Sequence, residues 1–251
     1  MPRGITQNEQ PAGVIFVCRT KSLIIGLFLQ PRRNRHVNVS TCVLVVVHTS
    51  QIPLTYGDTM HTICMLSLKG GAGKSTVVQS LAVCAVQHGQ KTLIVELDPQ
   101  GTQKNWSRRR RAAEPQVYQT LPQSLEDVLE EAQRDDTHWV FLDTPGHDTG
   151  TAAAAAAAAD IIIVPCKVQS MKDFDSVMQT LTEANRSDKP VYILMNQAPP
   201  NSKKLVARKR EEIETTYKVP VLSRYLSRRV DFEYCDAEGL SAAEYNPHGA
   251  A

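Results

Sequence analysis

A run of glycines followed by a lysine and two hydroxyl residues, SLKGGAGKST, occupies residues 67–76. Glycines at this spacing let the backbone turn tightly, so that consecutive N–H groups point at one anion. The lysine after them reaches the β- and γ-phosphates of a nucleotide, and the next hydroxyl is placed for Mg²⁺. The sequence therefore predicts a phosphate-binding loop, with Lys74 on the phosphates and Ser75 as a metal ligand. The residues that would hold the phosphates are Gly70, Gly71, Ala72, Gly73, Lys74, Ser75 and Thr76.

The residues on either side of this loop predict the strand and the helix that it needs. Residues 63–68 form a short apolar run ended by glycines, which is typical of a buried strand. Residues 75–88 carry apolar side chains on one helical face, and Gly89 follows where a helix ends. Residues 92–97 predict a second strand. This strand–loop–helix–strand order is the setting of a phosphate loop, and the alternative is a glycine-rich turn that binds nothing.

Two later apolar runs end in polar residues that could reach a nucleotide. HWVFLDT at 138–144 predicts a buried strand ending in Asp143, which would hold Mg²⁺ through water as a Walker B aspartate does. The glycine that follows, Gly146, is placed to offer its N–H to the γ-phosphate, so that the loop could sense that phosphate. PVYILMNQ at 190–197 predicts another buried strand, ending in Asn196.

Helices are predicted between these strands. SLEDVLEEAQR at 124–134 has Ser124 as its N-cap and apolar residues on one face. The alanine run at 152–159 consists of the best helix former and leads into the apolar strand at 161–166. Because strands and helices alternate, the sequence predicts an α/β fold with a mostly parallel sheet and helices on both faces.

Lys69 is a second lysine of the loop, for which an ordinary phosphate loop has no need. Leu68 stands where the ordinary loop pattern begins with glycine. Three motifs occur in the order KGGAGKST (69–76), DPQG (98–101) and DTPG (143–146). In this order they resemble the motifs of the ParA/MinD family of ATPases, whose deviant Walker A loop carries an early lysine.

The resemblance extends from about residue 60 to the end of the chain. Residues 221–245, VLSRYLSRRVDFEYCDAEGLSAAEY, are similar to the short plasmid-type ParA partition proteins. The resemblance implies a P-loop NTPase fold, ATP and Mg²⁺ as cofactors, and ATP hydrolysis.

The resemblance also implies roles for single residues. Lys69 corresponds to the signature lysine that crosses an ATP-bound dimer to touch the partner's nucleotide, and its alternative is a solvated loop lysine. Asp98 matches the aspartate that positions or activates the attacking water, and its alternative is a turn residue before Pro99. Glu96 stands where the second motif of the family usually has an aspartate, so the role of Glu96 is left open. Asn196 corresponds to the asparagine that recognises adenine, and its alternative is a strand-end turn residue.

Two basic regions near the C-terminus correspond to those with which ParA relatives bind DNA. Such phosphate contacts are salt-sensitive and independent of sequence. The alternative is that these side chains are solvated helix faces. A further basic run at 108–111 predicts only a surface helix beside the switch region. The candidate DNA-binding residues are Lys203, Lys204, Arg208, Arg224, Arg228 and Arg229.

Charge is distributed unevenly along the 251 residues, whose net charge is +2. The chain has 28 basic and 26 acidic side chains, of which residues 1–59 carry six basic and two acidic ones. The remaining residues therefore carry 22 basic and 24 acidic side chains, a net charge of −2. DNA affinity in the main domain must therefore come from local patches. We interpret residues 1–59 as a poorly defined leader, disordered or an over-extended start, and residues 60–251 as the ATPase domain. A genuine N-terminal module is the alternative.

The predicted function is plasmid or chromosome partitioning by an ATPase that dimerises on ATP and binds nonspecific DNA. A ParB-like centromere-binding partner would stimulate hydrolysis, and the protein would be cytoplasmic and nucleoid-associated. One alternative is a MinD-like membrane-associated positioning ATPase, but the tail AAEYNPHGAA contains Pro247 and Gly249, which break an amphipathic helix. Another is a metabolic P-loop enzyme of the dethiobiotin synthetase type. The six cysteines are scattered without metal-ligand spacing, which predicts small buried side chains in a reducing compartment.

Overall fold

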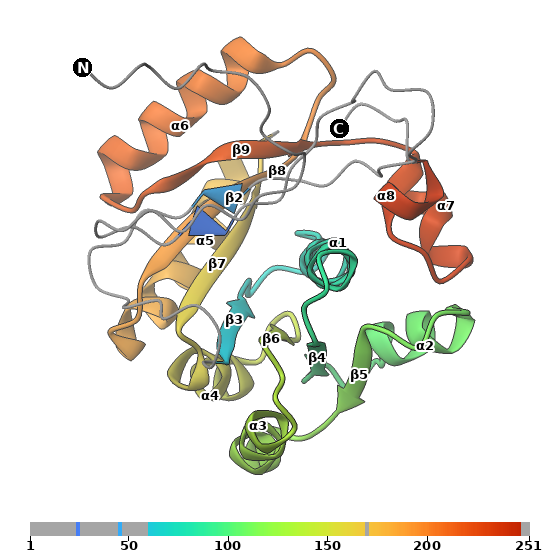
Figure 1. Ribbon diagram of the computed structural model, residues 1–251. Helices are drawn as coiled ribbons and strands as arrows, with labels where there is room; N and C mark the ends of the chain where they lie inside the picture. The colour runs from blue at the N-terminus through green and yellow to red at the C-terminus, as the bar shows by residue number, and fades with distance from the viewer. Residues whose placement is uncertain (1–23, 26–44, 47–59, 169–170, 247–251) are drawn as a thin grey trace, which may run out of the picture.

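A seven-stranded parallel sheet forms the centre of the computed structural model (Figure 1). The structure describes residues 60–168 and 176–246, and of residues 24–25, 45–46 and 171–175 the backbone alone. The strand order is β5-β4-β6-β3-β7-β8-β9, and every neighbouring pair is parallel. This confirms the predicted fold class. The strands are β3 (His61–Met65), β4 (Thr92–Glu96), β5 (Gln116–Gln119), β6 (Trp139–Asp143), β7 (Ile161–Lys167), β8 (Val191–Ala198) and β9 (Val221–Ser227).

The helices follow the strands in alternation. The α-helices are α1 (Lys74–Gln87), α2 (Thr102–Arg109), α3 (Leu125–Arg134), α4 (Thr149–Ala158), α5 (Met171–Ala184), α6 (Lys203–Tyr217), α7 (Asp231–Ala237) and α8 (Ala242–Tyr245). Two 3₁₀ turns, η1 (Pro122–Ser124) and η2 (Asn185–Ser187), precede α3 and follow α5. Most of the predicted leader lies outside the described residues, which include two short strands of it, β1 (Ile24–Ile25) and β2 (Val45–Val46), paired antiparallel. Its interpretation as a leader stays a prediction.

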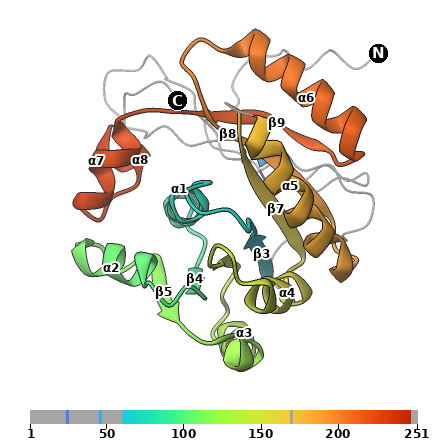
Figure 2. The same ribbon diagram turned by 180° about the vertical axis from the view of Figure 1, so that it is seen from behind.

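Two apolar cores cover the two faces of the sheet. One contains side chains of α3, α4, α5 and α6, and the other contains side chains of α1 together with Trp106 of α2. Figure 2 shows the helices on either side of the strands. Because both faces are covered, a strand such as β7 is apolar in nearly every position instead of alternating.

The strand order places the loop after β3 at a switch point of the sheet. β3 pairs with β6 on one side and β7 on the other, and the chain runs outward from it in both directions. Ligands of open parallel sheets bind outside the carboxyl ends of the strands at such a point. The fold therefore brings the ends of β3, β4 and β6 together around the predicted phosphate loop.

Three local expectations are corrected. Ser124 stands at the N-cap position of α3, as predicted, but its side chain makes no capping hydrogen bond. Helix α4 begins before the alanines, because the Asp148 carboxylate accepts hydrogen bonds from the N–H groups of Gly150 (3.0 Å) and Thr151 (3.2 Å). Of the cysteines, Cys64, Cys166 and Cys235 are buried and unpaired, whereas Cys84 is disulfide-bonded, contrary to the expectation for that residue. Within the described segments, no helix is both long and apolar enough to cross a membrane.

The basic run at 108–111 does more than cover a surface. The Arg110 side chain is only 4% exposed and makes two hydrogen bonds, of 2.7 and 2.8 Å, to the carboxylate of Glu244. Its guanidinium also lies 5.1 Å from the ring centroid of the fully buried Trp106. The indole N–H of Trp106 donates to the Leu240 carbonyl at 3.1 Å. These contacts join α2 to the C-terminal helices α7 and α8.

Glycine is required where α7 meets α2. A Cβ at Gly239 would lie 2.3 Å from the Arg110 backbone nitrogen, and the φ of Gly239 is +70°. Both the space and the backbone conformation exclude a side chain there. The junction depends on this close approach as well as on the buried ion pair.

A comparison of two neighbouring ion pairs tests this junction. Glu244→Gln leaves the buried Arg110 without its counterion, and we expect it to lower the free energy of unfolding by about 2 kcal/mol. The matched control is Asp236→Asn, which removes the counterion of the exposed Arg109 and should cost less than about 1 kcal/mol. Urea unfolding at pH 7 measures both, and equal losses would contradict the role given to the buried pair.

The stabilisation by Glu244 should also depend on pH. Burial raises the pKa of Glu244, but the hydrogen bonds from Arg110 and Ser241 outweigh it, and the net pKa lies below the ordinary value of 4.5. The stabilisation is therefore full above pH 4.5 and is lost as the pH falls below it. We expect the difference between wild type and Glu244→Gln to shrink in acid.

Candidate nucleotide-binding site

The predicted phosphate loop connects β3 to α1 at the carboxyl edge of the sheet. Gly71 and Gly73 have φ values of +72° and +90°, which only glycine adopts without strain. No side chain caps α1, whose N-cap is Gly73, so the first N–H groups of the helix are available to an anion. The backbone thus forms the anion-binding turn that the sequence predicts.

Lys74 lies buried beneath this loop. Its ammonium donates to the carbonyl of Ser67 at 3.1 Å. Burial lowers the pKa of Lys74, while the neighbouring carboxylates of Asp143 and Asp98 raise it in part. A buried lysine beside a helix N-terminus concentrates positive potential where phosphates would bind.

Asp143 ends β6 and is 1% exposed. One oxygen, Oδ2, accepts a hydrogen bond of 2.7 Å from the Gln103 amide, and the Ser75 side chain also hydrogen-bonds to the carboxylate. Burial raises the pKa of Asp143 to about 6, although the hydrogen bonds from Ser75 and Gln103 and the charge of Lys74 lower it. The structure therefore brings Ser75 and Asp143 together, and both were predicted as metal ligands.

Two buried oxygen atoms at this point lack a hydrogen-bond partner in the described structure, Oδ1 of Asp143 and Oε1 of Gln103. Leaving such atoms unpaired costs free energy, and a cation would satisfy them. No group of three or more His, Cys, Asp or Glu that could hold a metal occurs among the described residues. Mg²⁺ binds through one or two protein oxygens plus phosphates and water, so these residues fit Mg²⁺ held together with a nucleotide.

Glu96, which sequence analysis left open, organises this region. Its carboxylate accepts hydrogen bonds from the N–H groups of Gln103 (2.8 Å) and Lys104 (3.0 Å), in the first turn of α2. Burial raises the pKa of Glu96, whereas these backbone hydrogen bonds lower it in part. Glu96 thereby holds the start of α2 against the end of β4.

Gln103 is a site residue that sequence analysis missed. Its amide nitrogen donates to both Asp143 and the carbonyl of Ser75, at 2.7 and 3.1 Å. The available signal was helical spacing, because Gln103 lies one turn before the buried Trp106 and so faces inward with it.

Asp98 lies at the edge of the loop, half-buried. Its Oδ1 accepts the N–H of Gln100 at 2.9 Å, and its carbonyl accepts the N–H of Gly101 at 3.1 Å. The structure therefore shows Asp98 in a turn, and its role in orienting the attacking water stays a prediction. It is also close enough to Lys74 to raise the pKa of that lysine.

The loop after β6 touches the phosphate loop. A Cβ at Gly146 would lie 3.3 Å from the backbone nitrogen of Gly70, so there is little room for a side chain. The hydroxyl of Thr144 donates to the carbonyl of Met65 at 2.9 Å. Gly146 thus lies beside the phosphate loop, and the contact of its N–H with the γ-phosphate stays a prediction.

Asn196 supports the phosphate loop from the side. It lies within β8, not at its end, and its amide nitrogen donates to the carbonyl of Ala72 at 2.8 Å. A Cβ at Gly73 would clash with that amide, because it would lie 2.4 Å from the Asn196 amide nitrogen. Beside it lies a cleft of about 320 Å³, lined by residues that include Gly73, Thr76, Lys167, Asn196, Arg229 and Phe232.

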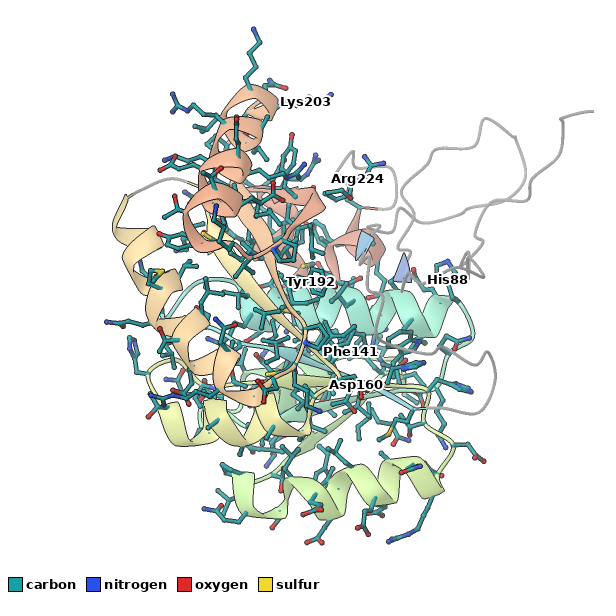
Figure 3. All side chains as sticks on the ribbon, turned by 90° about the vertical axis from the view of Figure 1, so that its left-hand side faces the viewer. His88, Phe141, Asp160, Tyr192, Lys203 and Arg224 are labelled. Carbon is teal, nitrogen blue, oxygen red and sulfur yellow. The ribbon has the colours of Figure 1, made fainter. Side chains whose placement is uncertain are left out.

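The six predicted DNA-binding residues separate into two groups. Lys203, Lys204 and Arg208 on α6 and Arg224 on β9 are exposed, and Figure 3 shows Lys203 and Arg224 in the same part of the molecule, away from Asp160. Arg228, which is also exposed, and Arg229 line the cleft beside the loop, with carboxylates of α7 at 3.8 and 3.1 Å.

The fold and the site together define a P-loop nucleoside triphosphatase. A family model described as the CobQ/CobB/MinD/ParA nucleotide binding domain matches residues 63–242, and the chain belongs to this family. It is accordingly an ATPase that binds ATP and Mg²⁺. ATPases of the ParA/MinD type dimerise on ATP and bind partner proteins.

Two curated relatives share part of the sequence. The chain is 27% identical over 197 residues to the maintenance of carboxysome distribution protein A of Halothiobacillus neapolitanus, covering 75% of this chain and 89% of that protein. It is 32% identical over 108 residues to the protein of the same name from Gloeobacter kilaueensis, covering 42% of this chain and 48% of that protein.

Solved structures share the fold. The septum site-determining protein MinD from Pyrococcus horikoshii with Mg-ADP has a TM-score of 0.59 at 16% identity, covering 76% of this chain and 90% of that one. McdA from Cyanothece with ATP has a TM-score of 0.56 at 15% identity, covering 76% of this chain and 92% of that one. A plasmid partition protein from Borrelia burgdorferi with AMPPNP has a TM-score of 0.54 at 15% identity, covering 75% of this chain and 96% of that one.

The raised pKa of Asp143 predicts how stability varies with pH. Between the ordinary value of 3.8 and about 6, the folded chain binds more protons than the unfolded chain, so stability falls as the pH rises. Above this window the buried charge costs about 3 kcal/mol. Asp143→Asn removes that cost, so without nucleotide it should be more stable than wild type at pH 8 and equally stable near pH 4.

Urea unfolding across this pH range measures the effect. The matched control is Asp127→Asn, an exposed carboxylate in the first turn of α3, which should leave the pH profile unchanged. A loss of stability in Asp143→Asn at pH 8 would show that the charged side chain stabilises the fold. The variant should also lose the Mg²⁺ dependence of ATP binding.

Proposed function

We propose that this chain is an ATP-driven positioning ATPase whose domain spans residues 60–251. Two chains close face to face around two ATP molecules, and each lends Lys69 to the other's nucleotide. The observation that carries the proposal is that the two lysines of the phosphate loop differ in burial. Lys74 is buried under its own loop, whereas Lys69 begins the loop and is only half-buried.

The ATP site supports hydrolysis with residues already close together. Ser75 and Asp143 hold Mg²⁺, which neutralises charge on the β- and γ-phosphates when bound. Asp98 orients the attacking water through its second carboxylate oxygen, Oδ2, while Oδ1 accepts the N–H of Gln100. The N–H of Gly146, beside Gly70, meets the γ-phosphate and couples its presence to the loop after β6.

The nucleoside part of ATP fits the cleft beside Asn196. This cleft begins at Gly73 and Thr76, where α1 starts, and its wall includes Phe232. An aromatic ring and the Asn196 amide are groups that recognise a base. We therefore assign Arg228 and Arg229 to the rim of the nucleotide cleft and leave the DNA surface to the other four basic residues.

The exposed cations of α6 and β9 form the proposed DNA surface. Arg210 fixes these two elements to each other, because its guanidinium donates to the carbonyls of Leu222 (2.8 Å) and Ser223 (2.7 Å). Lys203, Lys204 and Arg208 are thereby held beside β9 as phosphate-binding groups. Dimerisation doubles the number of contacts and makes DNA binding depend on ATP.

The proposed cargo is a plasmid or chromosome origin, carried through a ParB-like partner that stimulates hydrolysis, with the ATPase on the nucleoid. A second candidate cargo is a carboxysome, because both curated relatives carry the name of carboxysome distribution proteins. Deleting the gene in its host discriminates them. Plasmid or chromosome loss supports the first cargo, and clustered carboxysomes support the second.

Size-exclusion chromatography with and without ATP tests dimerisation. We expect ATP-dependent dimers in the wild type and in Asp98→Ala, where hydrolysis is blocked, and weaker dimers in Lys69→Ala. The control is Lys189→Ala, a lysine before β8 at the opposite edge of the sheet. A wild type that stays monomeric with ATP, or a Lys69→Ala variant that dimerises fully, would refute the proposal.

DNA binding is tested by fluorescence anisotropy on random duplex DNA with ATP at low salt. Replacing Lys203, Lys204 and Arg208 by alanine should weaken binding at least about tenfold and reduce the salt slope by about 3 per subunit. The control is Arg186→Ala, an exposed arginine after α5. Absence of ATP-dependent DNA binding in the wild type would overturn this surface, and binding to anionic vesicles instead would support the membrane-associated alternative.

A further inference from the structure

Lys167, at the carboxyl end of β7, is a third lysine beside the phosphate loop. Sequence analysis gave it no role, because it follows an apolar strand without any motif around it. β7 is the neighbour of β3, whose own end leads into the loop. The topology therefore brings the end of β7 next to residues that lie nearly a hundred positions earlier in the chain.

The Lys167 side chain lies beside the phosphate loop. Its backbone pairs in register with Asn196 of β8, whose amide holds the loop at Ala72. The ammonium nitrogen of Lys167 lies 3.6 Å from the point where a Cβ on Gly71 would be. The same side chain lines the cleft that begins at Gly73. It thus lies against the loop and faces the space beside it.

The other cations around this cleft have partners. Arg228 and Arg229 lie near the carboxylates of Glu233 and Asp231, and Lys74 donates to a backbone carbonyl. Among the described residues, the ammonium of Lys167 makes no hydrogen bond or ion pair. It stands in the positive potential of Lys74 and of the α1 N-terminus, which repels a cation. An anion bound to the loop would relieve this repulsion.

We propose that Lys167 binds the phosphate chain of the ATP held by its own subunit. The inference rests on the proposed nucleotide site and adds to it a phosphate-binding residue that no motif marks. Charge-assisted hydrogen bonds from an ammonium to phosphate oxygens are short and strong, and Lys167 already lies against the loop that would hold those oxygens. Lys167 thereby strengthens binding of the nucleotide and is distinct from Lys69, which serves the partner subunit.

Fluorescence titration of the full chain with ATP and ADP in the presence of Mg²⁺ tests this assignment. Lys167→Met keeps the apolar stem and removes the charge, and we expect it to weaken ATP binding about tenfold. Lys167→Arg restores a cation and should bind ATP within about twofold to threefold of wild type. The loss in Lys167→Met should shrink at high salt, because screening already weakens the interaction in the wild type.

Two controls separate this inference from the nucleotide site itself. Lys189→Met, at the opposite edge of the sheet, should bind ATP as wild type does. Lys74→Ala should abolish binding. If Lys167→Met binds ATP and ADP like wild type while Lys74→Ala does not bind, the role of Lys167 is refuted and the site stands. If wild type itself fails to bind ATP, both are refuted. A thermal unfolding curve like that of the wild type confirms that Lys167→Met is folded.

Discussion

The concentration of positive charge around one short loop is the constraint on which the rest of the structure depends. Lys69, Lys74 and Lys167 surround a turn whose N–H groups and helix dipole add to the same field. Such an arrangement is unfavourable until an anion enters it. Binding of a triphosphate is therefore coupled to the order of everything that touches the loop, including, in the proposed function, a second subunit.

Buried polar groups connect this loop to distant elements. Glu96 holds the first turn of α2, Gln103 of that turn holds Asp143, and Arg110 after α2 holds Glu244 near the C-terminus. Each link is a hydrogen bond with at least one buried partner, so a change at one end leaves a polar atom unpaired at the other. The C-terminal helices, which contribute to the proposed nucleotide cleft, are in this way fixed relative to the proposed metal site.

Much of the fold could be predicted from the sequence, because apolar strands, glycines with special backbone angles and helical spacing are local signals. The phosphate loop, Asp143 and Gly146 follow from motifs whose chemistry depends on neighbours in the chain. Helical spacing could have shown that Gln103 faces inward, but the partners of Gln103, Arg110 and Lys167 could not be predicted, since they come from other strands and helices. The hydrogen bond from Asn196 to the loop at Ala72 could not be predicted either, because only the register of β8 brings the two together, and the recognition of adenine by Asn196 stays a prediction.

The most direct test of the central claim, that Lys69 acts on the partner's ATP, is a subunit-mixing assay of ATP hydrolysis. Lys69→Ala and Asp98→Ala should each be inactive alone. In a mixed dimer, one site combines the intact Asp98 of one chain with the intact Lys69 of the other. At ATP and protein concentrations high enough for all chains to dimerise despite the weaker association of Lys69→Ala, an equal mixture should therefore recover about a quarter of wild-type activity, since half of randomly formed two-fold dimers are mixed and each has one working site. A mixture that stays inactive although mixed dimers form would contradict the account.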